Sequence, residues 1–324
     1  MSKKALLKLL RDRQGTYISG NELGTILGIS RAAVWKMVKA LREQGYRIES
    51  RTNKGYFLVE ESHQILEEEI THSLHTRVLG RPLQLMESVE STNTLVRQQS
   101  EQGLQEGYTL VALQQTGGKG RQGRRFHSPR GGVYMSVYLR PKIRVQDLTL
   151  ITFAGAVSVA KAAEECTGIP VEIKWINDLL IGERKLCGIL TEASMEAETG
   201  EISSVIVGIG LNVEQAPELE DGKKSVSLEQ MVSFTINKNE LIARILDHLE
   251  ENLENIQSNH REVLLNAYRS RLKLLGKQVS IRMQGESFLC TAVDLDETGG
   301  LVVKFPDGRC RTLRPGEASV LIQK

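Results

Sequence analysis

Residues 117–125 restrict the fold of this chain more than any other segment, because nine positions hold four glycines and four cationic side chains. Glycine allows a positive φ and lets the backbone approach a ligand closely. Lys and Arg carry donors that fit a phosphate or a carboxylate. A strand-like run at 108–115 precedes the segment, so we expect a sheet-anchored loop that closes over an anion. The residues are Gly117, Gly118, Gly120 and Gly123 with Lys119, Arg121, Arg124 and Arg125.

Two nucleotide-binding motifs resemble this loop without fitting it. Residues 118–123 match G-x-G-x-x-G, but a turn and an alternating strand at 133–139 follow where the dinucleotide motif requires a helix. The P-loop pattern fails because Gly120 follows Lys119 where that motif has Ser or Thr. A solvated basic hairpin or a non-specific RNA-binding patch remains open as the simpler alternative.

Composition indicates an ordinary globular protein. The 324 residues leave room for two or three domains, with 40% hydrophobic and 25% charged residues. No apolar run approaches the roughly 20 residues of a membrane span, and the N-terminus lacks a signal-peptide core. We therefore expect a cytoplasmic protein that does not contact membranes. The cysteines lie far apart without a C-x-x-C pattern, which favours reduced thiols over metal ligation; they are Cys166, Cys187, Cys290 and Cys310.

The formal net charge of +2 conceals an asymmetry between the two ends of the chain. Residues 1–59 contain 12 Lys and Arg against 4 Asp and Glu, so the remainder of the chain is acidic. A basic N-terminal module on an acidic body predicts that the small module binds a polyanion.

That module has the pattern of a winged helix-turn-helix. A first helix is expected at 3–14 with its leucines inward, and a short second helix begins at Ser19 or Gly20. Gly28 can end the second helix with a positive φ, and Ser30 is a good N-cap for a third helix at 31–44. The inward residues are expected to be Leu6, Leu7, Leu9 and Leu10, then Leu23, Ile26 and Leu27, then Val34, Val38 and Leu41.

DNA would meet the third helix and a basic wing. Residues 46–50 and 56–59 can pair around the turn at 51–55 as that wing, while the third helix enters the major groove. A small three-helix bundle with a solvated basic face is the alternative. The expected DNA contacts are Asn21, Ser30, Arg31, Ala32, Trp35, Lys36 and Lys39.

Strands and helices alternate through the rest of the chain. After an acidic linker or connecting helix at 60–75, a long apolar helix at 148–166 should be buried against a sheet. The other expected helices span 91–102, 238–257 and 260–274, and the expected strands span 83–87, 108–115, 133–139, 171–176, 186–193 and 204–210. A β-rich tail of the size of an SH3-like barrel follows, with strands at 278–282, 288–294, 300–305 and 309–314.

Four further clusters share the middle of the chain with residues 117–125, the Gly/Arg loop. Residues 90–93 place hydroxyls and an amide at a helix start, and residues 174–178 put a polar turn after an apolar strand. Residues 184–190 place Lys185 at the mouth of the next strand, and residues 208–213 read G-I-G-L-N-V. A helix cap, a buried ion pair or an exposed hairpin cation would explain the first three individually. Their order along the chain is more informative than any one of them.

In that order, S-T-N, Q-T-G-G-K-G-R-Q-G-R, K-W-I-N-D-L, R-K-L-C-G-I-L and G-I-G-L-N-V closely resemble the biotin protein ligase family. With the helix-turn-helix and the small tail, the whole chain resembles the bifunctional bacterial form, a biotin ligase and biotin operon repressor. The resemblance implies an α+β fold with three domains. These are a winged helix-turn-helix at 1–63, a class II synthetase-like ligase domain with a central mixed β-sheet flanked by helices at 64–274, and an SH3-like barrel at 275–324.

The resemblance also implies an activity and its partners. ATP and Mg would activate biotin to biotinyl-5'-AMP, and biotin would pass to a lysine of the biotin carboxyl carrier protein of acetyl-CoA carboxylase. Biotinyl-5'-AMP would serve as corepressor, with a homodimer of the bound form on an operator of inverted-repeat half-sites. A lipoate or octanoate ligase on the same scaffold, or a transcription factor that senses biotin without ligating it, are the alternatives.

Site residues follow from the resemblance position by position. Lys119 stands where the family usually has Arg, which keeps the charge but loses the bidentate fork. The implied biotin contacts are Ser91, Thr92, Asn93, Gln115, Lys119, Gly120, Arg121, Lys185 and Gly188. The implied ATP or adenylate contacts are Gly118, Arg121, Arg124, Lys185 and Asn212.

The chemistry of the residues agrees with these roles. Attack of a carboxylate on an α-phosphate brings anions together, so cations must offset their repulsion in the transition state. Lys185 and Arg121 are therefore the expected catalytic residues. No metal ligands are expected from the protein, because the triphosphate would coordinate Mg. Asp178 would be an outer-shell contact at most.

Overall fold

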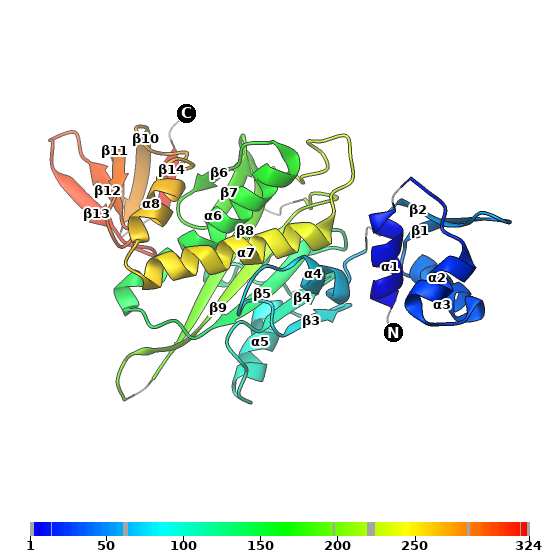
Figure 1. Ribbon diagram of the computed structural model, residues 1–324. Coiled ribbons are helices and arrows are strands. Elements are labelled where there is room, and N and C mark those ends of the chain that lie inside the picture. Colours follow the sequence, from blue (N-terminus) through cyan, green and yellow to red (C-terminus); the bar gives the residue numbers. More distant parts are fainter. Residues whose placement is uncertain are drawn as a thin grey trace. The chain divides into compact units, whose positions relative to one another are not determined.

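The structure is a computed structural model that describes residues 3–13, 15–60, 64–196, 198–218, 224–283, 286–317 and 319–322. The chain divides into two compact units (Figure 1). The first comprises Met1–Glu69 with Asn237–Asn239, and the second comprises Ile70–Ile236 with Glu240–Lys324. The boundaries expected at residues 63 and 274 stay predictions.

The first unit has the predicted winged helix-turn-helix, built from local caps. Ser19 accepts a hydrogen bond from the backbone N–H of Glu22 (3.1 Å), and Ser30 does the same for Ala33 (3.2 Å). Gly28 ends the second helix with φ 65°. The elements are α1 (Lys3–Asp12), α2 (Gly20–Leu27), α3 (Arg31–Glu43), β1 (Arg47–Arg51) and β2 (Gly55–Glu60), with β1 and β2 antiparallel.

The core of this unit corrects one expectation, because Ile26 is 48% exposed. Helix α2 buries Leu23, Gly24 and Leu27, and Gly24 packs so closely that a Cβ there would lie 2.7 Å from the carbonyl oxygen of Ile29. That close approach fixes which face of α2 turns inward and leaves Ile26 outside. Leu9 is only half-buried, whereas the other inward residues predicted on α1, α2 and α3 are buried.

The acidic segment that follows contains a short helix, α4 (Glu67–Ser73), so the connecting helix expected there is present. Residues 61–63 lie outside the described part of the chain. Within the first unit, Arg11 forms an ion pair with Glu69 (2.7 Å).

The second unit centres on a seven-stranded mixed sheet in the order β3-β4-β5-β9-β8-β7-β6, in which only β3 and β4 are parallel neighbours. The strands are β3 (Leu83–Met86), β4 (Thr109–Ala112), β5 (Val133–Leu139), β6 (Glu172–Lys174), β7 (Asp178–Ile181), β8 (Arg184–Met195) and β9 (Ile202–Leu211). Sequence analysis did not predict β7. Its residues, Asp178 followed by an unbroken apolar run, lie between two tight turns and show no alternation of polar and apolar side chains.

Helices cover both faces of this sheet. Helix α6 (Leu148–Thr167) is buried on several sides, and its Gly155 lies against Ile189 of β8 and Val207 of β9. Helix α7 (Lys238–Gln257) packs on α6, where Asn252 donates to the buried Ser158 hydroxyl (3.0 Å) (Figure 1). Helix α5 (Thr92–Ser100) lies on the other face, because Gly208, which alternates with Val207 along β9, faces Asn93. A 3-10 turn, η2 (Val145–Asp147), leads into α6.

Helix α8 (Arg261–Arg269) ends five residues before the expected boundary. The reason is a competing set of backbone bonds: Ile173 of β6 donates to Arg271 (2.7 Å) and accepts from Lys273 (3.0 Å). The segment after α8 therefore extends the edge of the sheet rather than the helix.

The tail is a five-stranded antiparallel sheet in the order β13-β12-β11-β10-β14. Its strands are β10 (Gln278–Met283), β11 (Glu286–Leu295), β12 (Leu301–Lys304), β13 (Cys310–Leu313) and β14 (Ser319–Ile322). The four expected strands are present, and β14 was not predicted. Trp175 binds the tail to the central sheet by donating to the carbonyl of Gly299 (3.2 Å). In the ranges that the structure describes, no helix combines the length and the apolar character needed to span a bilayer.

Candidate functional site

The candidate site lies on the α5 face of the central sheet, where two glycines of neighbouring strands face each other. Gly188 of β8 and Gly210 of β9 are direct cross-strand partners, and the ring of Phe126 lies over both. A Cβ on Gly188 would be 3.1 Å from that ring, and one on Gly210 would overlap it. Gly208, two residues before Gly210, leaves the space that the Asn93 side chain fills. These glycines make a flat floor for the groups above them.

The Gly/Arg loop above this floor is tied to itself by backbone hydrogen bonds. Gly120 donates to Arg124 (2.7 Å), and Phe126 donates to Gly118 (2.8 Å). A short 3-10 turn, η1 (Arg121–Gly123), forms the tip, where Gln122 has φ 57°. The loop therefore presents Arg121 from a closed hairpin-like turn.

A small charged cluster lies where β7 and β8 begin. The Lys185 Nζ and Asp178 Oδ1 atoms are 2.7 Å apart, and the two side chains are 26% and 28% exposed. Arg121 donates to Asn177 Oδ1 (3.4 Å), and Lys185 Nζ lies 5.6 Å from the centre of the Phe126 ring. Burial lowers the pKa of Arg121, an effect that the charge of Asp178 opposes and that of Arg124 reinforces. The cluster gathers two cations and one carboxylate from three separate segments.

A buried polar network fixes the residues at the start of α5. Gln115 accepts from the backbone N–H of Thr92 (2.8 Å) and donates to the Ser128 hydroxyl (2.8 Å). Asn93 donates to Glu192 (2.7 Å) and accepts from Ser136 (2.6 Å). Ser91 caps α5 through the N–H of Thr94 (3.5 Å). These hydrogen bonds fix the orientations of the side chains.

Asn212 lies at the end of β9 and is almost fully buried. Its Nδ2 donates to the carbonyl of Val226 (3.1 Å), while its Oδ1 accepts from no donor among the described residues. A buried acceptor without a donor is costly, so this oxygen fits a site that a ligand or water completes.

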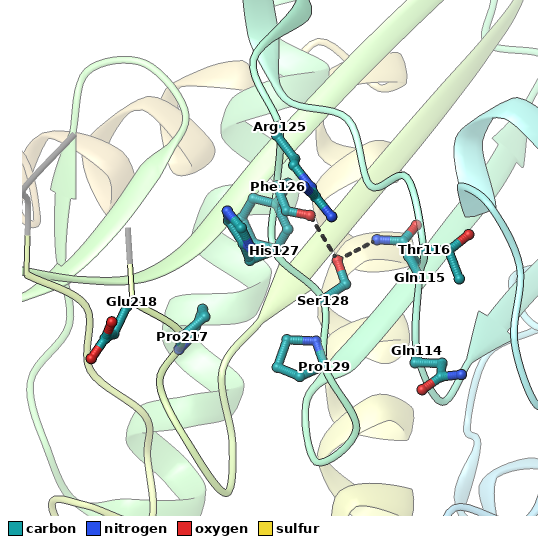
Figure 2. A pocket seen from close by; sticks show the side chains of 10 residues that line it. All are labelled: Gln114, Gln115, Thr116, Arg125, Phe126, His127, Ser128, Pro129, Pro217 and Glu218. Atoms are coloured by element: carbon teal, nitrogen blue, oxygen red, sulfur yellow. Dashed lines mark hydrogen bonds between the residues drawn. The ribbon is translucent and has the colours of Figure 1, made fainter. Parts of the chain in front are cut away.

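An open pocket of about 610 Å³ adjoins the polar network (Figure 2). Figure 2 shows Ser128 between Gln115 and the backbone carbonyl of Phe126, which its hydroxyl reaches (3.1 Å). The lining residues are Gln114, Gln115, Thr116, Arg125, Phe126, His127, Ser128, Pro129, Pro217 and Glu218. Gln115 and Phe126 link this pocket to the charged cluster.

The residues expected from the sequence divide into two groups. Lys185 and Gly188 lie beside Phe126, Arg121 binds Asn177 in the charged cluster, and Thr92, Asn93 and Gln115 form the adjoining network. The side chains of Lys119 and Arg124 are exposed on the loop, whose backbone Gly118 and Gly120 shape. Phe126, Gly210 and Asn177 were given no role, and Asp178 only that of a distant metal contact. The aromatic directly after the loop was a readable signal; the cross-strand pairing was not.

The first unit carries the other candidate surface, along α3 and the start of α2. Every residue expected to contact DNA is exposed: Asn21, Ser30, Arg31, Ala32, Trp35, Lys36 and Lys39. Helix α3 buries its opposite side through Val34, Val38 and Leu41. No three His, Cys, Asp or Glu side chains gather as a metal site in the described ranges of the chain.

Comparisons with known proteins agree with both surfaces. Residues 85–212 match the biotin/lipoate A/B protein ligase family, and residues 3–57 match an HTH domain. The chain is similar to the bifunctional ligase/repressor BirA of Bacillus subtilis, with 35% identity over 310 residues, 94% of this chain and 95% of the relative. It is 30% identical to the biotin–[acetyl-CoA-carboxylase] ligase of Mycobacterium tuberculosis over 71% of this chain and 87% of that one. A solved structure, the biotin protein ligase from Aquifex aeolicus in complex with biotin and ATP, superposes with a TM-score of 0.64 and 30% identity, over 74% of this chain and 99% of the other.

Proposed function

Because the chain belongs to the biotin protein ligase family, in its bifunctional ligase/repressor form, we propose that it activates biotin with ATP, biotinylates a carrier protein and represses transcription. The acceptor is a lysine of the biotin carboxyl carrier protein of acetyl-CoA carboxylase. The observation that supports the ligase assignment is the charged cluster in which Lys185 of β8 and Asp178 of β7 lie near Arg121 of the loop.

In the first step, a carboxylate oxygen of biotin attacks the α-phosphorus of ATP and pyrophosphate leaves. Lys185 lies at the entrance of β8, where one ammonium can contact both the carboxylate and an α-phosphate oxygen. Asp178 holds that ammonium in place before the substrates bind, since the two groups are 2.7 Å apart. Such preorganised donors stabilise charge that develops in the transition state.

Arg121 contributes a second positive charge in a partly desolvated environment. Burial lowers the pKa of its guanidinium because the charged form is poorly solvated there. An anion beside the guanidinium would stabilise that charged form. We assign it to the α-phosphate of the adenylate, together with Arg124 and the backbone of Gly118. Asn212, whose Oδ1 accepts from no described donor, would bind the adenylate from the other side.

Biotin itself would lie beside the Phe126 ring, against the polar network at the start of α5. Its donors and acceptors match the hydroxyls and amides of Ser91, Thr92, Asn93 and Gln115, with Lys119 and Gly120 on the loop side. Ser91, Thr92 and Asn93 are buried and Gln115 is held by hydrogen bonds, so these four side chains would orient the ligand.

In the second step, the lysine amine of the acceptor attacks the acyl carbon of biotinyl-5'-AMP and AMP leaves. The amine loses a proton as the amide forms. No nucleophilic side chain of this chain is needed, which agrees with the raised pKa of Cys187 caused by burial. Mg would bind the triphosphate and neutralise part of its charge. Asp178, which is paired with Lys185, would be an outer-shell contact of the metal at most.

Exchange of labelled pyrophosphate into ATP tests the ligase proposal. Biotin should support exchange, and lipoate and octanoate should not. Transfer of biotin to purified carrier protein should follow. Exchange with lipoate or octanoate alone would instead indicate a lipoate-type ligase, and failure to biotinylate any acceptor would indicate a biotin sensor.

For the repressor activity, the winged unit would bind an operator of two inverted half-sites as a homodimer loaded with biotinyl-5'-AMP. Negative charge from the adenylate would lower the repulsion among the cations of the Gly/Arg loop and stabilise one loop conformation that a second copy can contact. Sedimentation and DNA binding should therefore both change when biotin and ATP are added together. Equal dimerisation and equal operator affinity in both states would contradict this mechanism.

We assign repression to residues 1–63 and ligation to residues 64–274, with residues 275–324 as a separate tail domain. We place the protein in the cytoplasm.

A further inference from the structure

Trp35 is the least covered large apolar residue of the recognition helix α3, with 54% of its surface exposed. The core of the unit is already filled from the other side of the helix by Val34, Val38 and Leu41. Trp35 therefore contributes little to this core, and its indole remains available for a partner.

The side chains around Trp35 show what kind of partner fits. Arg31 precedes it by four residues and Lys39 follows it by four, so both lie on the same face of the helix. The aliphatic part of the Arg31 side chain lies against the start of α2. Its Cγ is 3.4 Å from the point where a Cβ on Gly20 would lie. This face thus surrounds one indole with cations.

Helix α3 itself carries almost no opposing charge. The helix contains no Asp or Glu before Glu43, its last residue. Elsewhere Glu22 pairs with Arg13 (2.5 Å), and Glu49 accepts from the Tyr17 hydroxyl (2.6 Å). The positive charge of this exposed face fits a polyanion rather than a basic partner or a neutral apolar one.

Duplex DNA presents one apolar group on its base edges in the major groove, the C5-methyl of thymine. We propose that Trp35 packs against a thymine methyl group and is a specificity-determining residue of the repressor, flanked by phosphate contacts from Arg31 and Lys39. The proposal rests on the DNA-binding function proposed above. It predicts a preference for thymine at one position of each half-site, independent of hydrogen bonding to the base.

The test removes only the methyl group. Duplexes are selected from a randomised pool with the full-length chain in the presence of biotin, ATP and Mg, and each thymine of the selected site is replaced in turn by deoxyuridine. We expect the contacted position to bind about 4-fold more weakly without its methyl group, the scale for one buried carbon. Trp35→Ala should bind the thymine and deoxyuridine duplexes equally, whereas Trp35→Phe should keep most of the difference.

A matched control is Lys39→Ala on the same face. It should weaken binding to all duplexes, lower the salt slope by about one, and leave the thymine preference unchanged. Circular dichroism and thermal melting check that each variant is folded, which the exposure of Trp35 favours.

Three results would overturn the proposal. Deoxyuridine at every position could leave parental affinity unchanged, or Trp35→Ala could retain the parental thymine preference. Trp35→Phe could also behave like Trp35→Ala, which would mean that the indole N–H reads a base acceptor. If the parental chain selects no DNA at all, the repressor function itself fails, which is a distinguishable outcome.

Discussion

Lys and Arg side chains are used in opposite ways in the two units of this protein. On α3 they point outward and are exposed, as Arg31, Lys36 and Lys39 show. In the candidate site Lys185 is mostly covered and paired with Asp178, and burial lowers the pKa of Arg121. The same two residue types thus work in water on one surface and under partial desolvation in the other.

This difference predicts different functions and different responses to salt. Exposed cations attract a polyanion over a distance, and ions screen that attraction within about 10 Å at moderate salt. Partly buried cations are screened less and act on charges that form a few ångströms away. The α3 surface is therefore suited to reversible DNA binding, and the Lys185 cluster to catalysis.

The largest expected effect separates the two surfaces completely. Removing residues 1–63 should abolish DNA binding and leave biotin transfer largely intact, because each unit has its own core. Electrophoretic mobility shift and carrier biotinylation measure the two activities in parallel. Loss of ligation in a truncated protein that melts cooperatively would show that the two surfaces do not work independently.

The next effect concerns the enclosed cation. Lys185→Ala should slow adenylate formation by roughly 10²-fold or more, the scale for one preorganised donor, and leave Asp178 without its pair. Pyrophosphate exchange measures this step. The control is Lys161→Ala on α6, whose ammonium lies 3.9 Å from Glu251, with an expected rate close to that of the parent. Exchange at the parental rate in folded Lys185→Ala would remove Lys185 from the mechanism.

A smaller effect is expected at Arg121. Arg121→Gly should release biotinyl-5'-AMP roughly 10-fold faster while synthesis continues in part, because a hydrogen bond to a charged group is lost. Rapid filtration of enzyme loaded with labelled biotin measures retention. Arg130→Gly, an exposed residue that is ion-paired with Glu87 outside the pocket, is the matched control. A variant that holds the adenylate as long as the parent would contradict the role.

The smallest effect sharpens the comparison by testing the floor beneath the cations. Gly210→Ala places a methyl group where the Phe126 ring lies, and overpacking of this kind costs about 1–3 kcal/mol. The KM for biotin should rise by roughly 5-fold, which corresponds to the lower end of that range. In a Phe126→Ala background the same substitution should cost less, so the two changes should not be additive. Strict additivity of the KM changes would separate Gly210 from Phe126.

The amino-acid sequence by itself predicted the first unit nearly in full. Its helix boundaries depend on neighbours within a few residues: Ser19 and Ser30 bind the N–H three residues on, and Gly28 takes a positive φ. The basic charge of residues 1–59 needed no structure either. In the second unit, the loop, the long helix α6 and strands such as β5 follow from equally local patterns.

Only the tertiary structure decided how the candidate site is assembled. The pairing of Gly188 with Gly210, the ring of Phe126 over them and the contact between Lys185 and Asp178 join segments that the sequence leaves separate. Strands β7 and β14 are apolar runs without an alternating pattern, although β7 supplies Asp178. Capping and periodicity are set by local backbone geometry, whereas cross-strand register and side-chain pairing depend on how the whole sheet folds.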